Sequence, residues 1–365
     1  MLKLNRFAIL LFAFISLSCL VSSAAAHTPL TPAEEIHSLD TAFEVPNPTK
    51  SWTLYRELHN EGEAEYYKLQ LNVGERLRVS IYTKEIDGNF APNLIIMAEN
   101  LPTDNSLPDY IEIPEGFGAK LVKSSIPDQP EYEPFTPASY YYIADVDETI
   151  SNEGDYYLVV YEPNLEEGKY GIAIGYKEEF TLSEWLLIPI DVISIHQWEG
   201  QSLILILMPL LLSVILGLGL LVWKSLVKLD LFNIVGVISG LLYVGSGLMT
   251  LMQMLLALYG SFFNSSVILT LVLIALPLAL GFFLLKKTIS FKGNLTITDR
   301  VVFVVLGLVG LFTWSGLLLG PCLAILIGFF PNRFSKKAKL INVSHTRCRI
   351  NNSCFLMFYL VNRLI

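Results

Sequence analysis

Acidic side chains crowd one short segment of the sequence. Five carboxylates fall within the eleven residues from 145 to 155. Carboxylate oxygens are hard ligands that Ca²⁺ prefers, which makes calcium the one cofactor that the sequence suggests. The four candidate ligands are Asp145, Asp147, Glu148 and Asp155. The EF-hand pattern fails, because Ile150 stands where such a loop needs glycine, so a solvated acidic turn is the favoured alternative.

A second group of side chains combines aromatic rings with a carboxylate. The candidate ligand-binding residues are Tyr132, Glu133, Phe135 and Tyr140. Rings beside acids are suited to stacking on a sugar or a peptide, and long loops on a rigid scaffold often carry function. In the alternative interpretation, these rings fill the core of the domain and the prolines around them stiffen the loop.

Patterns typical of catalysis are missing. The candidate histidines His37, His59 and His196 are widely spaced along the acidic part of the chain. The chain has no His-Glu-x-x-His and no Gly-x-Ser-x-Gly pattern. Each histidine is interpreted as an ordinary surface or junction residue, and no enzyme activity is predicted.

Charge divides the chain into two parts. Residues 27–200 carry 32 acidic and 10 basic side chains, a balance of −22, whereas the rest carries 2 acidic and 15 basic ones. The acidic part would repel phosphates, which excludes nucleic acid as a partner. It also contains no cysteine, so the domain must be stabilised by its own core.

Short runs of alternating residues predict β-strands in this acidic part. In the run 65–73, Tyr67, Leu69 and Leu71 share a face with Val73, and the run 76–82 alternates in the same way. Further runs at 94–97, 140–144, 156–161 and 170–176 have the same pattern. Several short strands without a convincing amphipathic helix predict an all-β, antiparallel sandwich.

Two segments resemble a known family. The run from Gly62 to Leu69 followed by Val73 to Val79, and later Gly154 to Tyr161 followed by Gly168 to Ile174, are similar to the opening and closing strand pairs of bacterial pre-peptidase C-terminal domains. The resemblance implies a jelly-roll-like β-sandwich with an accessory, binding-type role. The chain departs from the family pattern by an insertion at about 98–139, rich in proline and acids, which is the expected recognition surface.

The first 26 residues are typical of a secretory signal. Lys3 and Arg6 precede an apolar stretch from Phe7 to Val21, and three alanines at 24–26 suit cleavage. An uncleaved anchor is the alternative. The sequence therefore predicts a domain at 27–200 on the extracytoplasmic side of the cell membrane.

Four apolar runs follow, at 202–223, 231–258, 267–285 and 301–330, within a membrane block at 201–330. Each reaches the roughly 20 residues needed to cross hydrocarbon, so membrane lipid is an expected partner. The first three obey the positive-inside rule, with Lys224 and Lys286 in the cytoplasm. The fourth would deliver the basic tail, 331–365, to the outside. We expect one long or kinked helix there, although Gly320-Pro321 allows a break or re-entrant turn.

Small residues at four-residue spacing occur in two of these runs. Gly236 and Gly240 form one pair, and Gly316 and Gly320 form the other. Such spacing lets helix backbones approach closely. The close approach would serve either packing within one chain or a homo-oligomer.

These observations favour a membrane-anchored extracytoplasmic binding protein that recognises a glycan, a protein or an envelope component. The runs contain no Asp, Glu, Lys, Arg or His, which argues against a coupled pump. A transporter or channel component with the sandwich as its cap is the alternative, because four spans exceed what an anchor requires.

Overall fold

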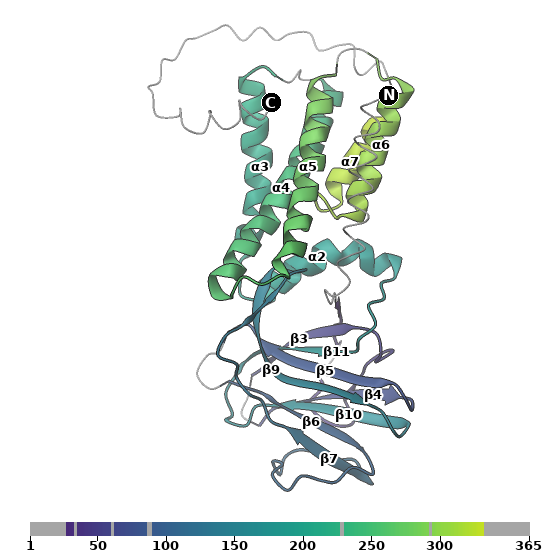
Figure 1. The fold of residues 1–365 in the computed structure, drawn as a ribbon, viewed down its shortest axis with the longest axis vertical. Helices are drawn as coiled ribbons and strands as arrows, with labels where there is room; N and C mark the ends of the chain where they lie inside the picture. The colour runs from purple at the N-terminus through teal and green to yellow at the C-terminus, as the bar shows by residue number, and fades with distance from the viewer. Residues whose placement is uncertain are drawn as a thin grey trace.

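The computed structural model describes residues 27–331 except 33–34, 60–61, 86–89, 227–229 and 292–293. A β domain is followed by a bundle of apolar helices, as the sequence predicts (Figure 1). The predicted signal segment at 1–26 and all but the first residue of the basic tail lie outside the described residues.

The β domain consists of two sheets. The first has the strand order β1-β3-β11-β5-β9-β8: β1 (Thr28–Pro29), β3 (Trp52–Leu58), β11 (Gly168–Ile174), β5 (Arg76–Thr83), β9 (Ala138–Thr149) and β8 (Glu131–Glu133). The second has the order β2-β4-β10-β6-β7: β2 (Phe43–Glu44), β4 (Ala64–Leu71), β10 (Gly154–Tyr161), β6 (Asn93–Glu99) and β7 (Phe117–Val122). The long strands pair antiparallel, while β1 with β3 and β2 with β4 add short parallel pairs. Both sheets are therefore mixed.

Alternation along the strands builds the core between the sheets. Tyr67 and Leu69 of β4 and Leu77 and Val79 of β5 are buried in one cluster, as the sequence predicts. Val73 is instead exposed, because β4 ends at Leu71 and the chain turns at Gly74, whose φ of +87° favours glycine. The apolar face of this strand is thus shorter than its pattern suggests.

The inserted segment 98–139 does not form a free loop. Ile111 belongs to a cluster with Tyr66 and Ile95 on the second sheet, outside the main core, and the Glu112 backbone N–H donates to the Tyr66 hydroxyl at 3.0 Å. The first part of the insertion therefore covers a sheet face. Its last part, β8 and the turn into β9, faces the helices (Figure 1).

A helix that the sequence analysis did not predict joins the two parts. α2 (Leu182–Trp198) begins with a capping box between Thr181 and Glu184 and lies across the junction of the sheets and the bundle (Figure 1). Its apolar residues occur on more than one face, because one side meets the protein while Leu186 and Ile190 are exposed. This mixed pattern hides the amphipathic period.

Three helices are long and apolar enough to cross a membrane: α3 (Leu203–Trp223), α4 (Leu231–Gly260) and α5 (Val267–Ile289). The expected single fourth helix is wrong. The run forms α6 (Ile297–Phe312) and α7 (Leu319–Gly328), joined by a turn. Leu317, Leu318 and Gly316 all have positive φ there, which no continuous helix allows.

The glycine pairs are used inside the chain. A Cβ at Gly236 would lie 2.5 Å from Thr288, and one at Gly240 would lie 2.7 Å from Leu285, so both let α4 approach α5. Gly320 similarly meets Tyr243 of α4, and Gly316 meets Leu242. All four glycines are buried. At these positions the close approach serves packing within one chain, and the homo-oligomer stays a prediction.

Candidate functional site at the junction

The β8–β9 hairpin docks on the membrane helices through hydrogen bonds and packing. The Tyr132 hydroxyl donates to Thr270 Oγ1 of α5 at 2.7 Å, and that threonine donates to the Pro134 carbonyl at 2.6 Å. The Tyr132 ring packs with Met254 and Ile274. A side chain expected to face a ligand is therefore only 5% exposed and joins the domain to the bundle.

Two tryptophans join α2 to the turn between α6 and α7. The Trp314 indole N–H donates to the Trp185 carbonyl at 2.8 Å, and their ring centroids lie 4.2 Å apart. Phe135 meets Trp314 edge to face at 5.7 Å. The turn between α6 and α7 thus holds both α2 and the sandwich hairpin.

The end of α2 carries a buried carboxylate–imidazole pair. His196 Nδ1 lies 2.9 Å from Glu199 Oε2, and the two side chains are 1% and 0% exposed. Glu199 also accepts the Tyr140 hydroxyl and lies 3.4 Å from Lys84 Nζ. Burial opposes ionisation of Glu199, but the hydrogen bond from His196 and the charge of Lys84 hold the pKa of Glu199 below its ordinary value. Glu199 is therefore a shared partner for groups from α2 and from the β domain.

An amide pair continues this polar contact into the bundle. Gln201 Nε2 donates to Gln253 Oε1 at 2.9 Å, and Gln253 Nε2 donates back to Gln201 Oε1 at 2.8 Å. Gln253, an amide within the apolar helix α4, thus has its partner just before α3. The oxygen and the nitrogen of its side-chain amide each have a hydrogen-bond partner.

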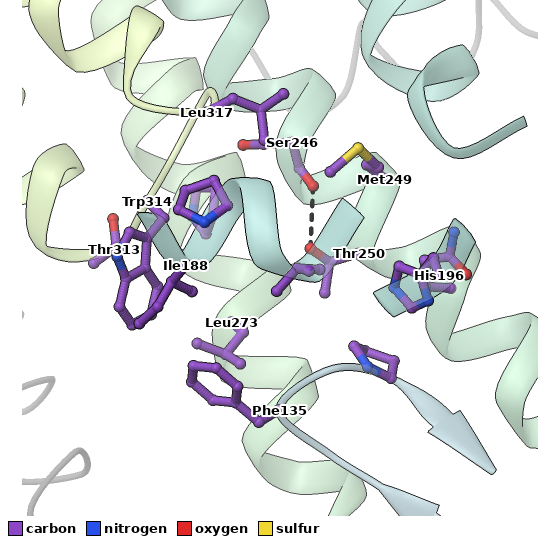
Figure 2. A pocket seen from close by; sticks show the side chains of 15 residues that line it. Phe135, Ile188, His196, Ser246, Met249, Thr250, Leu273, Thr313, Trp314 and Leu317 are labelled. Atoms are coloured by element: carbon purple, nitrogen blue, oxygen red, sulfur yellow. Dashed lines mark hydrogen bonds between the residues drawn. The ribbon is translucent and has the colours of Figure 1, made fainter. Parts of the chain in front are cut away.

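A cavity of about 90 Å³ lies where these elements meet. Figure 2 shows Phe135 from the hairpin, Ile188 from α2, Leu273 from α5 and Trp314 from the turn around it, with His196 at one end. The wall is mostly apolar. Its shape is formed by five separate segments, the fifth being α4, so neither part of the chain contains this cavity alone.

The polar groups of the cavity wall have protein partners, with one exception. Ser246 donates to the Tyr243 carbonyl, Thr250 to the Ser246 carbonyl and Thr313 to the Val309 carbonyl. His196 Nε2 is buried and has no hydrogen-bond partner among the described residues. Buried polar atoms without partners are rare in folded proteins, so this nitrogen makes the cavity the candidate site.

A smaller cavity of about 40 Å³ lies on the sandwich side of α2, with Glu133 in its wall. Burial raises the pKa of the Glu133 carboxyl to about 7, although the backbone N–H of Phe135 donates to it at 3.1 Å. Burial likewise raises the pKa of Asp191, which lines the same cavity from α2. Two carboxyl groups with raised pKa values therefore line this cavity, Glu133 from the sandwich and Asp191 from α2.

The four predicted ligand-binding residues come together, but not as an open surface. Tyr132 and Tyr140 are 5% and 3% exposed, and Phe135 packs on Trp314. Their rings are not available to stack on a sugar at the surface. Phe135 lines the larger cavity, Glu133 and Tyr140 line the smaller one, and Tyr132 is a docking residue.

The four predicted calcium ligands are instead paired with basic side chains. Asp145 lies 2.5 Å from Arg78, and Asp155 lies 2.7 Å from Lys68 on the other sheet. Asp147 pairs with Arg76, and Glu148 pairs with Lys120. The described residues do not gather these carboxylates into a shared cluster. The structure therefore does not assemble the predicted calcium site.

A different group, His37, Glu63 and Glu65, brings three ligand-type atoms close together. Glu65 is fully buried and already accepts hydrogen bonds from Arg56 and from the Tyr67 hydroxyl at 2.9 Å. Its oxygens are occupied by a guanidinium, which a cation would have to displace. The group is better explained as part of the domain's structure than as a metal centre.

His196 and Glu199 were not identified as a pair by sequence reasoning. Their separation of three residues is the only signal, and it matters only when the segment is a helix end. The Glu199 partners Tyr140 and Lys84 lie in distant strands and loops. No family model matches the chain, and no curated protein matches it, so the resemblance to pre-peptidase C-terminal domains stays a prediction.

Proposed function

We propose that this protein is a membrane-anchored extracytoplasmic binding protein whose ligand site is the junction cavity. The observation that carries the proposal is the unpartnered His196 Nε2 in the wall of that cavity. Apolar walls with a few polar groups are typical of small-ligand sites. Because the sandwich, α2 and the bundle all contribute to the wall, a ligand in the cavity would contact both parts of the chain.

Membrane lipid is the second partner in this proposal. The long helices expose many large apolar side chains, and α2 presents Leu182, Leu186 and Ile190 outward. A helix with an exposed apolar face beside membrane helices suits the bilayer interface. α2 would therefore lie in the interface, with the cavity at the depth of the lipid head groups.

The α6–α7 hairpin supports an orientation that agrees with the positive-inside rule, whereas a single fourth span would place the basic tail outside. The Arg300 guanidinium near the start of α6 donates to the Gly328 carbonyl at the end of α7, at 2.9 Å. Lys287 at the end of α5 pairs with Asp299 at the same end of the bundle. The chain thus leaves α7 on the side where Lys287 and Arg300 lie. A cytoplasmic position for that side obeys the positive-inside rule and puts the sandwich outside.

A binding screen on the full-length protein in lipid nanodiscs tests the function. Glycans, peptides and lipids are offered to the wild type and to Leu273→Trp, which fills the cavity. Leu271→Trp is the matched control, because Leu271 is exposed on the same helix. We expect a ligand that loses at least tenfold in affinity only in Leu273→Trp. Ligand binding unaffected by Leu273→Trp, or no ligand at all, would contradict the proposal.

Thiol labelling tests the orientation. In a cysteine-free background, a cysteine replacing exposed Asp147 is expected to react with an impermeant reagent in intact cells. A cysteine replacing Lys224, at the end of α3, is expected to react only after lysis. The reverse pattern would overturn the assigned orientation.

The alternative, a transporter or channel component with the sandwich as cap, is favoured by one observation. The helix broken between α6 and α7 lines the cavity with Thr313, Trp314 and Leu317. Broken helices in membranes are tolerated where they are buried in protein or line a cavity, and they form the binding sites of many transporters. Solute flux into proteoliposomes that Leu273→Trp abolishes would favour this alternative over simple binding.

A further inference from the structure

The protonation pattern of His196 follows from its neighbour. An ionised carboxylate only accepts hydrogen bonds, so Nδ1 must carry a proton in order to bond to Glu199. In the neutral imidazole, Nε2 then holds a lone pair without a protein partner, on a side chain that lines the cavity. The free group of the site is therefore a hydrogen-bond acceptor.

The rest of the wall excludes charge. Ile188, Met249 and Leu273 supply apolar surface, and the hydroxyl and amide groups of the wall already have partners. A charged ligand would lose its hydration without gaining a counter-charge, at a cost that such a wall does not offset. The complementary molecule is neutral, with an apolar body and one donor.

Cavity size limits that molecule. Water occupies roughly 30 Å³ per molecule in the liquid, so about 90 Å³ corresponds to about three waters or one small organic group. Buried waters typically make two to four hydrogen bonds, whereas the wall offers one unsatisfied atom. An organic hydroxyl with an apolar body satisfies that atom and fills the remaining space.

We propose that the junction cavity binds the hydroxyl-bearing end of a neutral alcohol or phenol, with the hydroxyl donating to His196 Nε2. This inference rests on the proposed function and names its ligand class. The source is either a small soluble alcohol or the hydroxyl end of a lipid, since both present the same group.

Phenol and toluene form the test pair, because they differ mainly in the hydroxyl. The full-length protein in nanodiscs carries 5-fluorotryptophan, and the fluorine resonance of Trp314 reports on the cavity, with Trp314→Phe used for assignment. We expect a saturable shift with phenol and roughly tenfold weaker binding of toluene, because toluene leaves a buried acceptor unpaired. Empty nanodiscs correct for partitioning into lipid.

Variants at His196 separate hydrogen bonding from packing. His196→Asn keeps a donor toward Glu199 but removes the acceptor in the cavity, so phenol is expected to bind no better than toluene. His196→Gln carries an amide at the position of Nε2 and is expected to restore part of the preference. His59→Asn is the control, since His59 is exposed in the β domain. Melting temperatures verify that each variant is folded.

The outcomes distinguish this inference from the proposed function. Equal binding of phenol and toluene, or a phenol preference that survives His196→Asn, overturns hydroxyl recognition while leaving the cavity as a site. Phenol that does not bind, together with another ligand that Leu273→Trp excludes, overturns only the inference. Displacement of phenol by hexadecanol in the nanodisc supports the inference with lipid as source, and retention of phenol supports it with a soluble source.

Discussion

Both ends of strand β9 carry side chains that the sequence offers as candidate ligands, but the two ends have opposite surroundings. At the end facing the bundle, Tyr140 is buried and donates to Glu199, which is itself without solvent exposure. At the other end, Asp145 and Asp147 lie at the surface beside Arg78 and Arg76. Residue type alone thus did not separate a buried junction from a hydrated surface.

The difference between the ends follows from what lies opposite each one. The surface acids lie beside basic residues of β5: Arg78 stands opposite Asp147 in register and pairs with Asp145, and Arg76 pairs with Asp147. The junction acid faces a histidine of α2 and a tyrosine of the sheet. Water screens the first set, whereas the second set is buried and depends on protein partners. Perturbing the two ends should therefore give effects of different size.

Glu199→Ala is expected to have the largest effect. It leaves His196, Lys84 and Tyr140 without their shared acceptor, and removing one member of a buried ionic group costs about 3–5 kcal/mol. Denaturant unfolding in detergent measures the loss. Asp147→Ala at the surface end is the matched control and is expected to change stability little. Equal losses for the two variants would refute the comparison.

The second-largest effect is expected from Glu133, which should make the free energy of unfolding depend on pH. Its pKa rises from 4.5 to about 7 on folding, so the folded state favours the neutral carboxyl. The associated stability is present below pH 4.5 and is lost as pH rises to 7, by at most about 3 kcal/mol. Glu133→Gln should remove this slope. Asp147, whose pKa Arg76 lowers, should give the opposite slope, with stability lost as pH falls. A wild-type profile identical to that of Glu133→Gln would exclude the buried state of this acid.

The hydrogen bond between hairpin and α5 should give a smaller effect. Tyr132→Phe and Thr270→Val are combined in a double-mutant cycle, with an expected coupling of about 1 kcal/mol. Thermal unfolding of the four proteins measures it. Tyr110→Phe on an exposed ring is the control and should show no coupling to Thr270→Val. Additive losses at Tyr132 and Thr270 would mean that the bond does not hold the domains together.

Calcium should have the smallest effect. The four predicted ligands already have basic partners, so millimolar calcium chloride is expected to leave the melting temperature unchanged. A saturable rise in melting temperature that Asp145→Asn abolishes would restore the calcium hypothesis and make the surface end of β9 the functional one.

The sequence predicted the parts of the fold that depend on local periodicity. Alternation located β4 and β5 and their buried faces, and apolar length located α3, α4 and α5. It failed where a segment has contacts on two sides. α2 has apolar residues toward both the protein and its surroundings, which hides its helical period. The strand β3 was not predicted because Trp52, Thr53 and Leu54 are three consecutive buried residues, so the strand lacks an alternating pattern.

The candidate site was only half predictable. Tyr132, Glu133, Phe135 and Tyr140 were identified by their types, and they do lie together, but against the helices instead of solvent. Whether a ring is a binding surface or a docking contact depends on residues such as Thr270 and Trp314, more than a hundred positions along the chain. Only three-dimensional structure brings such partners together.

The turn between α6 and α7 has a consequence for the order of assembly. Trp314 is among the last described residues to leave the ribosome, yet it contacts Trp185 and Phe135, which are made much earlier. The β domain has every strand it needs before the bundle exists, and domains generally fold as units during synthesis. Closure of the junction must therefore wait for insertion of the α6–α7 hairpin, so His196 acquires its enclosed surroundings only after that step.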